Sequence, residues 1–180
     1  MKKLVTCAEM KDLDSMTIRE IGVPSEVLME RAALKVVEET EKYLQKDERI
    51  LVVCGSGNNG GDGIAVARLF HLKGIRAEFY MAGNKDKMTR ETALQYKIAS
   101  GYRVPEVNNP QWSEYTTIVD AVFGVGLTRP IEGHYAAIIH EMNSARAKKI
   151  AVDIPSGVNG DTGLEMGIAF SADLTVTFAY

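Results

Sequence analysis

Residues Ile50 to Arg68 constrain the fold more than any other segment, because they combine a strand, a glycine loop and a helix. The apolar run Ile50 to Cys54 has the length and β-branched content of a buried strand. Gly55, Gly57 and Gly60 follow with the G-x-G-x-x-G spacing, and apolar residues then recur with helical spacing. Such a loop lets the backbone approach a ligand, and the free N–H groups of the helix favour an anion. The segment therefore predicts a phosphate-binding βαβ unit.

The residues Asn58 to Asp62 are unusual for a plain dinucleotide loop. Two amides and a carboxylate beside a pyrophosphate indicate a role beyond holding the ligand. No Lys-Ser or Lys-Thr pair follows the glycines, which excludes a P-loop. Asp62 also has a purely structural interpretation, as an acid that caps the helix or lies in its first turn.

Composition limits the class of protein. A chain of 180 residues with 46% hydrophobic content has enough apolar side chains for one core. Its net charge of -3 leaves no basic patch for nucleic acid, and no apolar run approaches the ~20 residues of a membrane span. Cys7 and Cys54 lie far apart, so a disulfide framework is not expected and a cytoplasmic location is the default.

Strand and helix patterns alternate along the chain, which predicts an α/β fold with parallel crossovers. We expect a Rossmann-like three-layer αβα sandwich with a mostly parallel central sheet and an N-terminal helical extension. The single domain, 1–180, divides into a helical part, 1–48, and a core, 49–180, and we expect it to be truncated at its C-terminal end. The predicted strands are 50–54, 75–81, 102–107, 116–122, 148–154 and 174–178, and the core helices are 61–73, 87–100 and 130–144.

Three predicted strands are followed by loops rich in glycine and oxygen-bearing side chains. These loops are Gly55 to Asp62, Asp120 to Gly133 and Asp153 to Gly163. In an open parallel sheet, ligands bind beyond the carboxyl ends of the strands. Three such loops at one edge predict a site for a phosphate-bearing ligand.

Asp120 and Asp153 each follow an apolar strand, where a carboxylate is costly unless it is bound. Either residue could instead cap the N–H groups of its own loop. Together with Asn59 and Ser156 they supply only hard oxygen donors, which suit a hard cation and not zinc or copper. Arg129 has two interpretations, as a phosphate ligand or as a solvated loop arginine.

The segments GSGNNGGDG, VDAVFGVGLTR and AVDIPSGVNGDTG resemble, in order and spacing, those of the NAD(P)H-hydrate epimerases, the YjeF N-terminal domain family. The opening VTCAEMKDLDSMTIREIGVPSEVLMERAA is similar to the helical N-terminus of that family. The resemblance implies an isomerase with a Rossmann-like sheet. It would interconvert the R and S epimers of hydrated NADH and NADPH, as part of nicotinamide cofactor repair. The hydrate would be its substrate and not a cofactor.

The resemblance also implies site residues. One potassium ion per subunit would be held by Asn59, Asp120 and Ser156, and Asp153 would contact the substrate. We expect Asp153 to be the catalytic residue, which protonates the departing hydroxyl and then, as the conjugate base, activates the returning water. The implied substrate-binding residues, besides Asp153, are Asn58, Asn59, Gly60, Gly61, Asp62, Gly124, Val125, Gly126, Leu127, Thr128, Arg129, Pro130 and Tyr135.

The partners implied by the resemblance are a second copy of the chain, as a homodimer, and an ADP- or ATP-dependent NAD(P)HX dehydratase, fused or separate. A non-catalytic nucleotide-binding or protein-interaction module of the same fold is the alternative. Such a module would be free to lose its acids. The presence together of Asn59, Asp120, Asp153 and Ser156 favours the enzyme.

Overall fold

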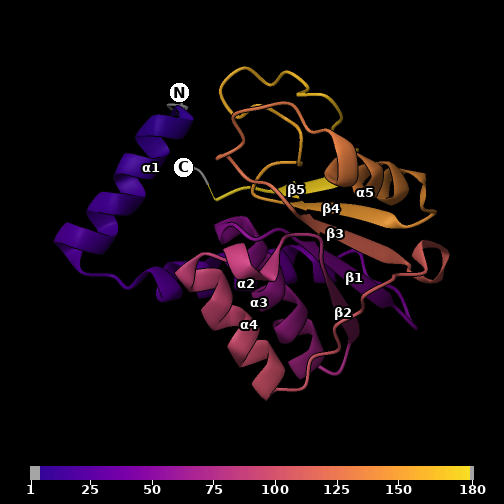
Figure 1. Ribbon diagram of the computed structural model, residues 1–180. Helices are drawn as coiled ribbons and strands as arrows, with labels where there is room; N and C mark the ends of the chain where they lie inside the picture. Colours follow the sequence, from indigo (N-terminus) through magenta and orange to yellow (C-terminus); the bar gives the residue numbers. More distant parts are fainter. Residues whose placement is uncertain (1–4, 179–180) are drawn as a thin grey trace.

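The computed structural model describes residues 5–178 and contains a five-stranded sheet in which every strand pair is parallel (Figure 1). The strand order is β2-β1-β3-β4-β5, so the chain leaves β1 on one side for β2 and returns to the other side for β3. This reversal places the topological switch point, where ligands bind in such sheets, between β1 and β3. The strands are β1 (Arg49–Cys54), β2 (Arg76–Met81), β3 (Thr117–Ala121), β4 (Lys148–Val152) and β5 (Leu174–Val176).

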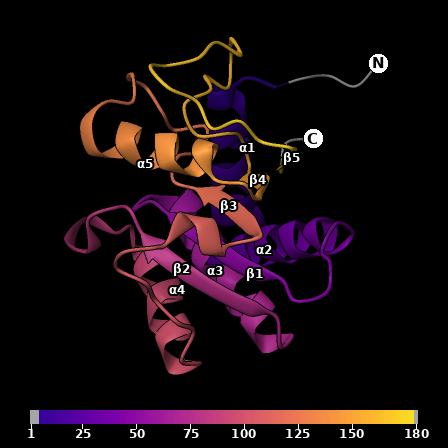
Figure 2. The same ribbon diagram turned by 90° about the vertical axis from the view of Figure 1, so that its right-hand side faces the viewer.

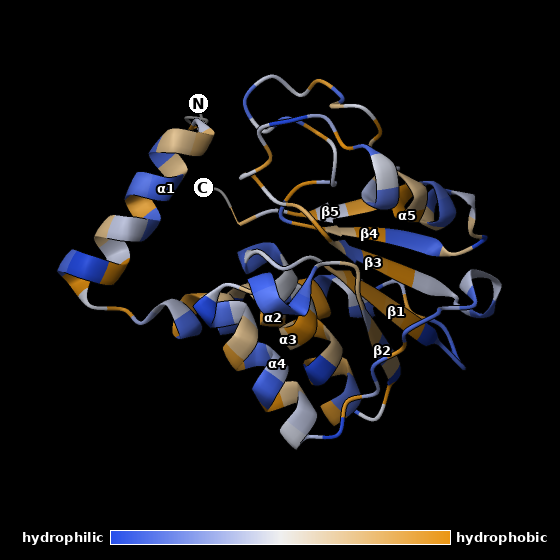
Figure 3. Ribbon diagram, viewed as in Figure 1, coloured by the Kyte–Doolittle hydropathy of each residue, from blue (hydrophilic) through white to orange (hydrophobic). Residues whose placement is uncertain are grey.

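Helices cover both faces of the sheet, which confirms the predicted αβα sandwich (Figure 2). Ile50 and Val52 of β1 pack toward one set of helices, and Leu51 and Val53 pack toward the opposite face. All four are fully buried, as expected for a parallel strand covered on both sides. Figure 3 shows this apolar interior in the strands and in α3. One face carries α2 (Ser25–Glu41), α3 (Asn58–Leu72) and α4 (Arg90–Gly101), and the other carries α5 (Gly133–Ser144).

The helix after the glycine loop begins at Asn58, three residues before the predicted start. Glycines are poor helix formers, so propensity alone places Gly60 and Gly61 outside the helix. Close packing nevertheless places both glycines within α3. A Cβ atom on Gly60 would lie 1.9 Å from the carbonyl oxygen of Gly55. Only glycine at position 60 therefore lets the first turn of α3 approach the end of β1 this closely.

Two other predicted elements differ from the structure. Residues 102–107 form no strand, and only a single parallel bridge joins Glu106 to Phe79. Helix α5 begins at Gly133 and not at Pro130. The N–H group of Ile131 donates to the carbonyl of Met166, so this residue is bonded to another loop and not to a helical turn.

The N-terminal helix α1 (Cys7–Met16) continues into a π-helical turn, Thr17–Ile21, and contributes no buried residue. A capping box between Thr6 and Glu9 begins it. The backbone N–H of Cys7 donates to Asp161 Oδ1 at 2.7 Å, which anchors α1 to the loop after β4. Figure 1 shows α1 standing beside the edge of the sheet where the strands end. Among the described residues, no helix has both the length and the apolar character needed to cross a membrane.

Candidate functional site

The glycine loop and the N-terminus of α3 form the floor of the candidate site. A Cβ atom on Gly55 would lie 2.1 Å from the carbonyl oxygen of Val122, so this glycine lets the end of β1 approach the end of β3. Gly57 has no atom within 4 Å of its Cβ position and is exposed. It is the N-cap of α3, and no side chain within residues 5–178 bonds to the free N–H groups there. An uncapped helix N-terminus behind an open glycine is suited to an anion.

Helix α4 holds this loop in place. The hydroxyl of Thr92, a fully buried residue, donates to the carbonyl of Gly57 at 2.8 Å. The N–H of Thr89 donates to the carbonyl of Ser56 at 3.0 Å. Sequence reasoning missed both threonines. Thr89 carries a recognisable signal as the N-cap of a helix, but nothing in the local pattern connects Thr92 to the glycine loop.

Asp120 is fully buried at the end of β3 and is bonded to two loops. Its Oδ1 accepts hydrogen bonds from the N–H of Val122 at 3.1 Å and from Ser156 Oγ at 2.7 Å. Its Oδ2 accepts from the N–H of Ser156 at 2.7 Å. Burial raises the pKa of Asp120 to about 6, and the bonds from Ser156 oppose that rise. Asp120 therefore caps its own loop and also ties the loop after β4 to β3.

Asn59 lies beside this pair of loops with an unsatisfied side chain. Both its amide nitrogen and its amide oxygen are buried and have no hydrogen-bond partner in the described part of the chain. A buried polar group without a partner costs about 1–3 kcal/mol. A Cβ atom on Gly124 would lie 3.4 Å from Asn59 Cγ and 2.9 Å from Asp153 Oδ2. Gly124 thus lies between Asn59 and Asp153, and the three strand-end loops meet there.

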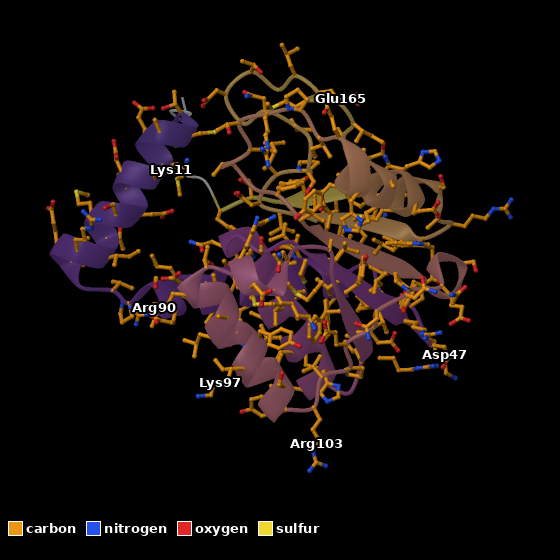
Figure 4. The ribbon with its side chains drawn as sticks, in the orientation of Figure 1. Lys11, Asp47, Arg90, Lys97, Arg103 and Glu165 are labelled. Carbon is orange, nitrogen blue, oxygen red and sulfur yellow. The ribbon has the colours of Figure 1, made fainter. Side chains whose placement is uncertain are left out.

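Asp153 follows β4 directly and has a left-handed backbone, with φ of 69°. Two other described non-glycine residues with positive φ, Asp47 and Arg103, lie at the periphery of the molecule (Figure 4). Backbone conformations of this kind concentrate at functional sites. Asp153 Oδ2 accepts a hydrogen bond from the N–H of Val125 at 3.3 Å. Burial raises the pKa of Asp153, and the bond from Val125 partly offsets that rise.

Asp62 is not a helix cap, so its structural interpretation is wrong. Gly57 occupies the N-cap position, and the first turn of α3 contains no acid. The described residues offer the Asp62 carboxyl neither a hydrogen bond nor an ion pair. Burial raises its pKa well above the ordinary range, and the charges of Asp153 and Asp14 raise it further. Asp62 and Asp153 therefore lie close enough to influence one another.

Asp14 brings α1 to the same edge of the sheet. Its carboxyl is electrostatically coupled to both Asp62 and Asp153, and partial burial raises its own pKa. No sequence signal marks Asp14, because its coupling to Asp62 and Asp153 depends on where α1 is placed in space.

The loop from Gly124 to Pro130 has a buried and an exposed part. Val125 and Leu127 are partly buried, and Leu127 N–H donates to the carbonyl of Gly124. Gly126 and the segment from Thr128 to Pro130 are exposed, and Arg129 forms no ion pair with any described residue. Tyr135, in the first turn of α5, packs edge-on against Phe123 with 4.9 Å between the ring centroids. The structure thus brings Asn59, Asp62, Gly124 and Asp153 together at the carboxyl ends of the strands, and places Arg129 in solvent.

Comparison with known proteins gives concordant matches. The sequence profile of the family described as YjeF-related protein N-terminus matches residues 25–180. NAD(P)H-hydrate epimerase of Limosilactobacillus reuteri strain ATCC 55730 / SD2112 is 48% identical, and the match covers 99% of this chain and 85% of that protein. NAD(P)H-hydrate epimerase of Oenococcus oeni is 47% identical, with 98% and 85% covered. The crystal structure of yeast YNL200c has a TM-score of 0.86 at 23% identity, covers 98% of this chain and 80% of its own, and so shares the fold.

Proposed function

Because this chain belongs to the family of YjeF-related protein N-termini, we propose that it is an NAD(P)H-hydrate epimerase, an isomerase that interconverts the R and S forms of hydrated NADH and NADPH. Identities of 43–48% to epimerases over nearly the whole chain support the assignment. The structural observation that carries it is the convergence of Asn59, Gly124 and Asp153 from three strand-end loops.

The substrate is an anion with a modified ring, and the site offers groups for both parts. The uncapped N-terminus of α3, open at Gly57, supplies N–H groups for the phosphates. The segments from Asn58 to Asp62 and from Gly124 to Pro130 surround the nucleotide, and Tyr135 adds a further contact. The left-handed backbone of Asp153 holds its carboxyl at the end of β4, where the hydrated nicotinamide ring binds.

The chemistry at Asp153 follows from the structure of the substrate. The hydroxyl is on C6 of the nicotinamide ring, next to the ring nitrogen. The nitrogen lone pair expels this hydroxyl and leaves a planar cation, and water then adds to the other face of C6. Asp153 is placed to carry a proton in this reaction: its acid form can give a proton to a departing hydroxyl, and its conjugate base can accept a proton from entering water. Burial raises the pKa of Asp153, which favours the protonated form that can give a proton to the hydroxyl.

The oxygen atoms of Asn59, Asp120 and Ser156 fit a potassium ion, one per subunit. The amide oxygen of Asn59 is buried without a partner, which is expected of a group that awaits a ligand. Asp120 and Ser156 provide further hard donors in a buried position. When bound, the cation supplies positive charge that offsets the carboxylates and the substrate phosphates.

We also propose that the enzyme is a homodimer that acts in the cytoplasm and supplies an ADP- or ATP-dependent dehydratase, fused or separate, with the epimer it consumes. The apolar side chains exposed on α1 and the following turn support pairing of protomers there. These residues are Leu13, Met16, Ile18 and Ile21. Cys7 and Cys54 are both free thiols, as is usual in a reducing compartment, which supports that location.

Equilibration of the pure S-hydrate tests the proposed function. The S-hydrate of NADPH is incubated with the protein in potassium chloride or in choline chloride, and chromatography separates the epimers over time. We expect the protein to accelerate the approach to the R/S equilibrium, and to do so more strongly in potassium. A rate equal to that of buffer in both salts would show that the protein is not an epimerase.

A further inference from the structure

Inversion at C6 requires proton transfer on both faces of the nicotinamide ring. The hydroxyl departs from one face with an added proton, and the entering water loses a proton on the opposite face. Asp153 approaches from the end of β4, and its Oδ2 is held by the N–H of Val125. A carboxyl held in this way exchanges protons with only one face of the nicotinamide ring, unless the ring turns over within the site. A second proton-carrying group is therefore expected on the opposite side.

The contacts of neighbouring residues on α3 indicate the direction in which Asp62 points. Successive helical residues point about 100° apart, so four consecutive positions sample the whole circumference. The Cβ positions of three of these residues are closed off by neighbouring segments. A Cβ atom would contact Gly55 if it were on Gly60, Met29 and Thr92 if it were on Gly61, and Ala121 and Cys54 if it were on Gly63. Asp62 points in the direction that these contacts leave open. There burial and the charges of Asp153 and Asp14 raise the pKa of its carboxyl. Asp62 thus enters from the helical layer and Asp153 from the strand ends.

No structural role accounts for Asp62. It caps no helix and has no hydrogen bond or ion pair with the described residues. A carboxyl taken from water without a partner is costly. Its charged neighbours, Asp153 at the end of β4 and Asp14 on α1, are both acids and disfavour its ionised form. The nearby Asp153 differs, because it accepts a hydrogen bond from Val125 that favours its carboxylate.

We infer that Asp62 is a second catalytic residue of the epimerisation, paired with Asp153 across the nicotinamide ring. This inference rests on the proposed function. In one direction Asp62 gives its proton to the C6 hydroxyl, the C6–O bond breaks, and the ring nitrogen lone pair forms a C=N bond as water leaves. A water molecule on the other face then forms the new C6–O bond and gives a proton to Asp153. The products are the opposite epimer, ionised Asp62 and protonated Asp153, so the reaction is redox-neutral.

The protonation state left after one turnover is the state that catalyses the reverse reaction. Exchange of protons with solvent restores the first state. Two carboxyls, one protonated and one ionised, therefore serve both directions.

Isotope exchange separates this inference from a single-residue mechanism. Wild type, Asp62→Asn, Asp153→Asn and Asp12→Asn proteins are incubated with each pure epimer in ¹⁸O-water. Chromatography measures inversion, and mass spectrometry measures ¹⁸O in each epimer. We expect Asp62→Asn to invert at least ~100-fold more slowly than wild type. It should still exchange ¹⁸O without inversion in the epimer whose hydroxyl faces Asp153. Asp153→Asn should show the same behaviour with the other epimer.

The Asp12→Asn protein is the matched control, because it removes an exposed acid of α1 that lies outside the site and should invert within about threefold of wild type. Inversion by Asp62→Asn at a rate near that of wild type would overturn the inference. Loss of both inversion and exchange in Asp62→Asn, with NADPH still raising its melting temperature, would also overturn it. Asp62→Glu, which keeps the acid, should retain measurable inversion, and its complete loss would likewise contradict the inference. A wild-type protein that inverts neither epimer would instead refute the proposed function.

Discussion

Ser156 donates two hydrogen bonds to Asp120, one from its hydroxyl to Oδ1 and one from its backbone N–H to Oδ2, each 2.7 Å long. The Ser156 hydroxyl also accepts a hydrogen bond from the N–H of Phe123 at 2.8 Å. These contacts join the loop after β4 to the end of β3. The two bonds to Asp120 are buried and the bond from Phe123 is partly buried, so each one contributes more than an exposed hydrogen bond would.

Replacing Ser156 with alanine should destabilise the protein by about 1–3 kcal/mol, because Phe123 N–H and Asp120 Oδ1 each lose a buried partner. Urea unfolding measures this change. Ser144→Ala is the matched control, because its exposed hydroxyl bonds to the carbonyl of His140 within α5 and its loss should cost less than about 0.5 kcal/mol. Equal effects of the two substitutions would contradict the proposed importance of the Ser156–Asp120 contact.

Replacing Gly124 with alanine should disable the site and leave the fold intact. The added Cβ atom would lie 2.9 Å from Asp153 Oδ2, and this flexible side-chain end would have to move. A displaced catalytic group costs up to ~100-fold in rate, so we expect epimerisation to fall at least tenfold with a melting temperature close to that of wild type. Gly101→Ala, at an α4 position with no atom within 4 Å, is the control and should keep full activity. Full activity of Gly124→Ala would show that the Asp153 position is not critical.

Replacing Asp62 with asparagine should stabilise the protein at neutral pH, and the gain should grow with pH. The folded-state pKa of Asp62 is raised, whereas an unfolded aspartate has a pKa of about 3.9. Above about pH 4 the unfolded chain therefore releases this proton more readily than the folded chain, and the wild type loses stability as pH rises. Urea unfolding from pH 4 to pH 8 measures the difference, which should reach about 1–2 kcal/mol.

Asp12→Asn controls for the loss of one negative charge, because Asp12 is an exposed residue of α1. Its effect on the free energy of unfolding should be below about 0.5 kcal/mol at every pH. A stability gain in Asp62→Asn that does not vary with pH would contradict the raised pKa of Asp62.

Replacing Asp153 and Asp120 should have different consequences. Asp153→Asn keeps the size of the side chain, so NADPH should still raise the melting temperature while inversion is lost at least ~100-fold. Asp120→Ala should weaken both the potassium dependence and the affinity for substrate. A potassium titration of the epimerisation rate and of its KM distinguishes the two variants. Activity of wild type that does not depend on monovalent cations would contradict the potassium assignment.

Much of the fold was predictable because it depends on local patterns. The apolar run Ile50 to Cys54 is buried on both faces, and such runs alternating with helical periods indicate a parallel sheet. Parallel strands place their carboxyl ends at one edge, so the meeting of Asn59, Gly124 and Asp153 was also predictable in outline. Helix boundaries were less predictable. The start of α3 at Asn58 depends on the approach of Gly60 to Gly55, which opposes the low helix propensity of glycine.

By itself, the sequence determined the order of strands and helices and the three loops that carry oxygen donors, because hydrophobic period and turn residues act over a few neighbours. Only the tertiary structure decided which groups are buried and which lack partners. The contact of Thr92 with Gly57 and the coupling of Asp62 with Asp153 and with Asp14 on α1 all join segments distant in the chain. Burial and coupling between charges depend on these distances in space, so the acid–base character of the site appears only in the folded protein.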